Sequence, residues 1–134
     1  MFSKNKNFSL FVKKIVFKCN KLPWSVTILL DSEGTLWFLF RSVLFNLGFV
    51  ENKLRFYPIF VLEAKDFIRV VAVEEIKHLY EEEHVFGLYE VSRGYLFIDE
   101  EHVNIYISRT PDEKKKEAFS ATINKAKKEL KLDV

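Results

Sequence analysis

Two hydrophobic periods divide the chain into predicted strands and helices. Apolar and polar residues alternate loosely from Phe8 to Lys18, and β-branched residues continue from Trp24 to Leu30. Because side chains of a strand point alternately to its two faces, both segments predict strands. A turn signal at Asp31-Ser32-Glu33-Gly34 precedes a further apolar run from Thr35 to Phe38. The N-terminal third therefore predicts a hairpin or meander.

The period changes after this third strand. Apolar residues then fall at i, i+3, i+4 and i+7, namely Phe40, Val43, Leu44 and Leu47. This spacing predicts a helix over 39–47, with Gly48 at the left-handed C-cap position. The segment 54–62 is ambiguous, and Pro58 within it favours an edge strand or a connection. A second helix is predicted over 73–83, with Ile76, Leu79 and Tyr80 on one side.

The C-terminal half repeats the strand-then-helix pattern. Strands are predicted over 86–91 and 95–98, separated by the turn Ser92-Arg93-Gly94, and Asp99 is a good N-cap for a short helix through Ile107. The last helix begins with Thr110-Pro111-Asp112-Glu113, which predicts a capping box with Thr110 as N-cap. Its apolar stripe is Phe119, Ile123, Ala126 and Leu130.

The two halves of the chain share a short internal repeat at an offset of 60 residues. The segment 32–38 aligns with 92–98, and Val43 and Leu47 fall on Val103 and Ile107. Each copy predicts a turn, a strand and a short helix. We therefore expect a single α+β domain over 1–134, in which two strand-helix units build a small antiparallel sheet that a C-terminal amphipathic helix closes.

Composition narrows the class of protein. The chain has 134 residues, 49% of them apolar and 16% aromatic, which excludes a disordered chain. One cysteine, Cys19, excludes a disulfide framework. No apolar run reaches the roughly 18 residues that cross a bilayer, and no signal peptide is present at the N-terminus. These features predict a soluble intracellular protein that is not secreted and has no membrane partner.

Enzyme signatures are weak. Glu75 and His78 have the Glu-x-x-His spacing of di-iron bundles, but no second such pair exists. His84 and His102 belong to no zinc motif, and Cys19 has no neighbours that mark a nucleophile. The sequence therefore predicts no catalysis, no metal and no cofactor.

The distribution of charge is more informative than its total. The net charge of +2 divides into +6 over residues 1–22, −7 over 23–108 and +3 over 109–134. Basic ends around an acidic middle are a recognised hint of a polyanion partner, although solvated termini give the same pattern. Lysines can follow backbone phosphates without reading bases, and arginine presents a planar fork of donors. The candidate nucleic-acid-binding residues are Lys13, Lys14, Lys18, Arg41, Arg109, Lys114, Lys115, Lys125 and Lys128.

Several short motifs resemble the BRO-N domain of baculovirus and phage proteins. They are Gly34-Thr35-Leu36-Trp37-Phe38, Asn46-Leu47-Gly48-Phe49, Leu96-Phe97-Ile98-Asp99-Glu100 and Ile105-Tyr106-Ile107-Ser108-Arg109 followed by Pro111. The resemblance covers about residues 15–125, and the last helix departs from the family's ending. It implies a viral DNA-binding or regulatory protein that contacts single- or double-stranded DNA in a host cytoplasm or nucleus.

A protein-interaction module is the alternative function. Fourteen phenylalanines are more than a small domain easily buries, and exposed apolar patches mark interfaces. The acidic run 81–83 offers a basic partner a docking point. This alternative predicts a homodimer or a heteromeric contact without nucleic acid. Its candidate interface residues are Phe2, Phe8, Phe11, Phe45 and Phe49.

Overall fold

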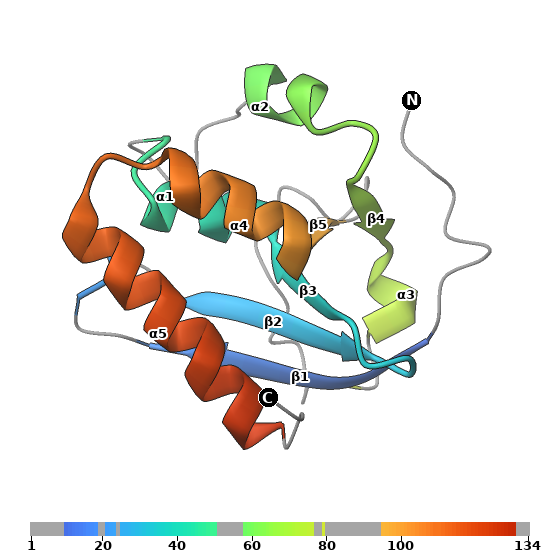
Figure 1. Cartoon of the computed structure of the whole chain (residues 1–134). Helices are drawn as coiled ribbons and strands as arrows, with labels where there is room; N and C mark the ends of the chain where they lie inside the picture. Colours follow the sequence, from blue (N-terminus) through green and yellow to red (C-terminus); the bar gives the residue numbers. More distant parts are fainter. Residues whose placement is uncertain are drawn as a thin grey trace.

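The structure is a computed structural model that describes residues 10–18, 21–23, 25–50, 58–76, 79 and 95–130. Its centre is an antiparallel sheet of five strands in the order β1-β2-β3-β5-β4 (Figure 1). The strands are β1 (Phe11–Phe17), β2 (Val26–Asp31), β3 (Leu36–Leu39), β4 (Arg69–Val71) and β5 (Tyr95–Asp99). The expected α+β fold with a small antiparallel sheet and a C-terminal helix is confirmed.

The helices gather mainly on one face of the sheet. They are α1 (Phe40–Asn46), α2 (Pro58–Glu63), α3 (Val73–Ile76), α4 (Glu100–Arg109) and α5 (Glu113–Glu129). In Figure 1, α5 crosses β2 and β1, while α1 and α4 lie side by side over the upper part of the same face. This face carries the larger apolar cluster.

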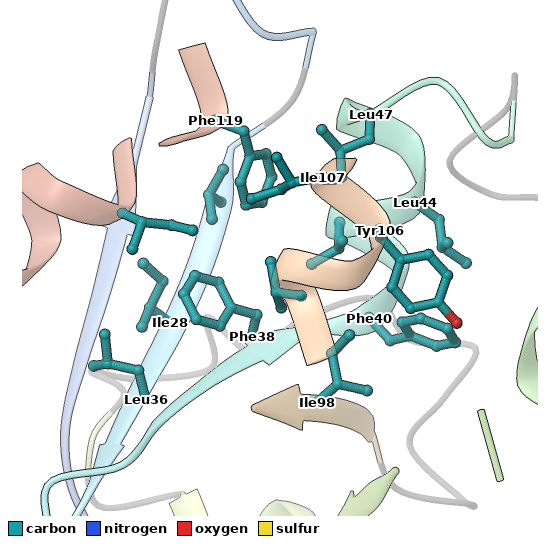
Figure 2. Packing of buried hydrophobic residues seen from close by; sticks show 14 of the residues in the cluster. Ile28, Leu36, Phe38, Phe40, Leu44, Leu47, Ile98, Tyr106, Ile107 and Phe119 are labelled. Atoms are coloured by element: carbon teal, nitrogen blue, oxygen red, sulfur yellow. The ribbon is translucent and has the colours of Figure 1, made fainter. Parts of the chain in front are cut away.

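Figure 2 shows how that cluster is filled. Phe38 and Ile28 point from the strands toward Phe119 of α5, and the Phe38 and Phe119 rings are 6.4 Å apart. Phe40 and Tyr106 meet edge to face at 5.6 Å and join α1 to α4. The predicted stripe of α5 is buried throughout, so its amphipathic pattern is confirmed: Phe119, Ile123, Ala126 and Leu130.

The opposite face of the sheet is apolar as well. A second buried cluster lies there, to which all five strands and α3 contribute: Phe11, Leu29, Trp37, Leu39, Val71, Ile76, Tyr95 and Phe97. The central strands are therefore buried on both sides, which explains why β3 is a continuous apolar run with no alternation of polar residues.

A β-bulge sets which side of the sheet Phe11 faces. Phe11 pairs with Asp31, whereas Lys13 pairs with Leu30, so Val12 is an extra residue in β1. Because side chains alternate along a strand, strict pairing would put Phe11 on the same face as Lys13. The extra residue instead carries Phe11 to the opposite face, where it is 2% exposed.

The internal repeat corresponds to a two-fold arrangement of ββα units. The two units are β2-β3-α1 and β4-β5-α4. Their strands lie in the sheet in the order β2-β3-β5-β4, so the second unit has the reverse order of the first and the two pair through β3 and β5. Phe38 pairs directly with Ile98, and the offset of 60 makes these two residues equivalent. Their helices also begin 60 residues apart, at Phe40 and Glu100, and contribute to the same apolar cluster. Strand β1 and helix α5 are additions to this repeat.

Other local predictions have mixed outcomes. Gly48 has φ +88°, which confirms the left-handed C-cap after α1. Asp99 caps α4 by accepting a hydrogen bond from the His102 backbone N–H at 3.0 Å, as predicted. The segment from Pro58 to Glu63 is helical, so the expectation of an edge strand or connection is wrong there. Proline is tolerated at the first position of a helix, where its missing N–H would have no partner.

Two further points concern the ends of predicted elements. The N-cap of α5 is Asp112, whose side chain accepts from the backbone N–H groups of Lys114 and Lys115, so Thr110 as N-cap is wrong. The predicted helix 73–83 begins correctly as α3. Residues 77, 78 and 80–83, the predicted strand 86–91 and the turn 92–94 lie outside the described residues.

Candidate nucleic-acid interface

The packing of α5 against β1 brings the two basic ends of the chain together. The two elements are in contact, and Lys125 Nζ lies 6.0 Å from the centre of the Phe17 ring at the end of β1. Lys18 follows Phe17 directly and is exposed. Residues from the +6 and +3 segments therefore share one side of the molecule, which the sequence alone could only pose as a question.

Three exposed lysines form a stripe along α5. Lys114, Lys125 and Lys128 are separated by 11 and 3 residues, which places them on one side of an α-helix. At 1.5 Å per residue the stripe is about 21 Å long. The exposed residues Glu117 and Ala121 lie between them on the helix.

These lysines differ from their neighbours in their ion pairs. Lys116 Nζ is 3.3 Å from Glu113 Oε2, and Lys127 Nζ is 2.7 Å from Glu100 Oε2. Among the described residues, Lys114, Lys125 and Lys128 form no ion pair within 4.0 Å. Their charge is therefore available to an external anion, whereas Lys127 ties α5 to α4.

Strand β1 contributes lysines to both faces of the sheet. Lys13 pairs with Leu30 and shares a face with Ile15 and Phe17, which is the face that α5 covers. Lys14 has the opposite parity and is half-buried on the other face. We therefore assign Lys13, and not Lys14, to the same side as the α5 stripe, while Lys18 lies exposed just beyond the end of β1.

A second, smaller basic site surrounds the end of α1. A Cβ atom on Gly48 would lie 3.4 Å from Lys115 Nζ, so this ammonium lies close to the C-terminal turn of α1. Arg109 Nη1 is 3.2 Å from Glu63 Oε1, and its guanidinium lies 5.5 Å from the Phe49 ring centre. Arg109 is thus held by an acid and an aromatic ring, which reduces its availability to phosphate.

Arg41 does not belong to this surface. It lies on α1 and is 4% exposed, so it does not present a guanidinium to solvent. Tyr95, at the start of β5, is fully buried and cannot stack on a base. Tyr95 is buried because apolar clusters cover both faces of the sheet.

The predicted interface phenylalanines that the structure describes are not exposed. Phe11 is buried beneath Arg69, whose guanidinium lies 4.0 Å from the ring centre, so it is not an exposed interface residue. Phe45 and Phe49 are half-buried, and Phe49 packs edge to face on Phe60 at 5.7 Å. No phenylalanine is exposed in the part of the chain that the structure describes, and Phe2 and Phe8 lie outside it.

A buried polar cluster that was not predicted from the sequence lies on the face of the sheet opposite α5. Asp31 Oδ1 accepts from the backbone N–H groups of Glu33 at 3.0 Å and Thr35 at 2.9 Å, and Oδ2 accepts from Trp37 Nε1 at 3.1 Å. Arg69, which is 1% exposed, lies 3.5 Å from Glu75 Oε1. Burial lowers the pKa of Arg69, and the charges of Glu75 and Asp31 oppose that shift.

This cluster is structural in its chemistry. Its hydrogen bonds close the β2–β3 turn and join β4 to the start of α3, where Glu75 Oε2 accepts from the Ala72 N–H at 3.0 Å. The cluster was not predicted from the sequence, because β4 itself was not predicted. A turn Asp three residues before a Gly, followed by a Trp, is its visible trace in the sequence.

His102 has a structural role, and the described residues contain no candidate metal cluster. No three His, Cys, Asp or Glu side chains among them cluster in a way that would hold a metal ion. His102 Nδ1 is 2.6 Å from Asp99 Oδ1, and its ring stacks on Phe67 at 3.9 Å, so it helps to fix the start of α4. None of the described helices is long and apolar enough to cross a membrane.

Comparison of the chain with models of known protein families, with curated proteins and with solved structures finds no match.

Proposed function

We propose that this protein is a non-enzymatic, BRO-N-like DNA-binding or regulatory protein of viral origin that contacts backbone phosphates with little sequence preference. One observation carries the proposal: α5 packs against β1, so that lysines of both basic segments lie on one side without carboxylate partners among the described residues. The interface comprises Lys13, Lys18, Lys114, Lys125 and Lys128.

Lysine chemistry supports backbone contact over base reading. An ammonium group is a point charge on a flexible stem, which neutralises a phosphate without a fixed geometry. Binding then gains free energy from the release of condensed counterions. If all five lysines contact phosphates of duplex DNA, the slope of log K against log salt approaches about −4.5, at roughly 0.9 per contact.

The test is a salt titration of binding to a fluorescently labelled 20-base-pair duplex, followed by fluorescence anisotropy. The Lys125→Ala/Lys128→Ala variant removes two contacts, so its slope is expected to be shallower by about 1.8. The control variant Lys65→Ala/Lys116→Ala loses the same charge from outside the interface, where Lys116 is already paired with Glu113. It is expected to keep the wild-type slope.

Two results would count against the proposal. One is the absence of an anisotropy change at low salt with micromolar protein. The other is an equal loss of slope in the two double variants, because the net charge of the protein and not this surface would then drive binding.

A further inference from the structure

The charges on the exposed side of α5 are not spread evenly along the helix. Lys114 lies near its start, Lys125 and Lys128 lie near its end, and the exposed residues Glu117 and Ala121 lie between them on the same side. At 1.5 Å per residue, Lys114 and Lys125 are about 16 Å apart along the helix axis. The stripe therefore has cationic groups at its two ends and a carboxylate in its middle.

No neighbour that the structure describes neutralises this carboxylate. Among those residues, Glu117 forms no ion pair within 4.0 Å, whereas Glu113 Oε2 is 3.3 Å from Lys116 Nζ. Glu113 and Glu129 lie roughly a fifth of a turn to either side of the stripe, because each residue advances the helix by about 100°. A phosphate over the middle of the stripe would therefore face a negative charge.

Packing holds the two cationic ends at a fixed separation. On the opposite side of α5, Phe119 and Ala126 are fully buried, and Lys127 Nζ is 2.7 Å from Glu100 Oε2 on α4. Because the helix is anchored along its length, a ligand has to present its anionic groups at the spacing that the lysines set.

Two rows of phosphates with a gap between them fit this spacing better than one continuous row. A single strand laid along α5 carries a phosphate at every nucleotide, so some of its phosphates would face Glu117 and be repelled. The major groove of B-form DNA is about 12 Å wide and has phosphates along both borders and none over its floor. Lysines about 16 Å apart reach both borders, whereas the minor groove, at about 6 Å, is too narrow for them.

We infer that α5 bridges the major groove of B-form duplex DNA. Lys114 contacts phosphates of one strand, Lys125 and Lys128 contact phosphates of the other, and Glu117 lies over the groove between them. The inference rests on the proposed phosphate contacts and goes beyond them, since it names duplex DNA as the ligand and assigns the groove.

The test compares the binding of the full chain to three labelled probes of one sequence, by fluorescence anisotropy at low salt. They are a 20-base-pair duplex, the same duplex with glucosylated 5-hydroxymethylcytosine in place of cytosine, and a single strand. The glucose groups fill the major groove and leave the phosphates unchanged, because the C5 position of a pyrimidine faces that groove. The unmodified duplex is expected to bind at least about tenfold more tightly than either other probe. Distamycin, which fills the minor groove, is expected to change the affinity by less than about twofold.

A matched pair of variants tests whether both cationic ends are needed. Lys114→Ala removes the contact with one strand, so the protein can turn away from the groove. This variant is expected to bind the unmodified duplex more weakly and to discriminate between the two duplexes by less than about threefold. Lys116→Ala loses the same charge, but Lys116 is paired with Glu113 and lies outside the stripe. It is expected to keep the wild-type discrimination.

The outcomes separate this inference from the proposed function. Equal binding to the two duplexes, binding to the single strand as tight as to the unmodified duplex, or displacement by distamycin would each overturn the inference and leave the phosphate contacts standing. Wild-type discrimination in Lys114→Ala would overturn it as well. If none of the probes binds, the proposed function itself fails, and the inference fails with it.

Discussion

Asp31→Asn is expected to destabilise the fold by more than its conservative chemistry suggests. The Asp31 side chain is almost fully buried and accepts three hydrogen bonds, two from backbone N–H groups and one from the indole N–H of Trp37. Asparagine can keep the two backbone bonds through its carbonyl oxygen. Its amide group would then face the indole, so that two donors meet, and the negative charge near Arg69 would be lost.

The magnitude follows from the bond that is lost. A hydrogen bond to a charged group contributes about 1.5–3 kcal/mol, and a buried donor without an acceptor costs a similar amount. We therefore expect the free energy of unfolding to fall by about 2–3 kcal/mol. For a chain of this size, that corresponds to a decrease in Tm of roughly 5–12 °C.

Urea denaturation followed by tryptophan fluorescence and by far-UV circular dichroism measures this change. Asp112→Asn is the matched control, because Asp112 Oδ1 also accepts two backbone N–H bonds but is exposed at the start of α5. Asparagine and aspartate are nearly equivalent as N-caps, so the control is expected to lose only a few tenths of a kcal/mol. Equal losses in the two variants would refute the reasoning that burial and Trp37 set the cost.

Three further predictions test other parts of the fold. Phe119→Ala should lower the free energy of unfolding by about 3–5 kcal/mol in urea denaturation, because the ring is fully buried between α5 and the sheet. Gly48→Ala should cost about 1–2 kcal/mol by thermal denaturation, since φ is +88° there, and a loss below 0.3 kcal/mol would contradict this. Burial, and then the charge of Glu63, raise the pKa of Tyr106 above 10. The folded state therefore holds this proton longer than the unfolded chain, and stability should fall as the pH rises above about 10. Tyr106→Phe should lessen this alkaline loss in urea midpoints measured between pH 8.5 and 11.5.

Regular periodicity made much of the fold predictable. The burial of Phe119 and Ile123 in α5 and the left-handed Gly48 followed from helical spacing and glycine chemistry, which are local properties. The strand-helix repeat was visible because β3 and β5 have the same apolar run before a helix. Their direct pairing, Phe38 with Ile98, was not visible, since the sequence does not record which strands become neighbours.

Tertiary contacts explain the predictions that differed from the structure. Thr110 has the sequence of an N-cap, but its hydroxyl donates to the Leu47 carbonyl at 2.7 Å and joins the α4–α5 connection to α1. Asp112 then caps α5 in its place. Strand β4 has only three residues, and one of them is Arg69, so no alternation marks it. The burial of Arg41 was equally hidden, because a charged residue on a helix is usually exposed.

Tertiary contacts also decide which residues belong to the candidate site. The candidate basic residues could be named from the sequence, but the choice between them depended on contacts elsewhere in the chain. Arg109 is paired with Glu63, and Lys14 lies on the face opposite α5. Only the three-dimensional arrangement separates these from Lys125 and Lys128.

The palindromic centre of the sheet has an evolutionary consequence. A single ββα unit such as β2-β3-α1 would leave the inner edge of its second strand open and the apolar side of its helix half-covered. Two copies joined by the pairing that Phe38 and Ile98 now make would close both surfaces at once. An ancestral gene of about half this length could therefore encode a stable protein only as a symmetric dimer. Fusion of two such copies in one chain lets the halves diverge, and Leu29 in one half and Arg69 in the other occupy equivalent strand positions.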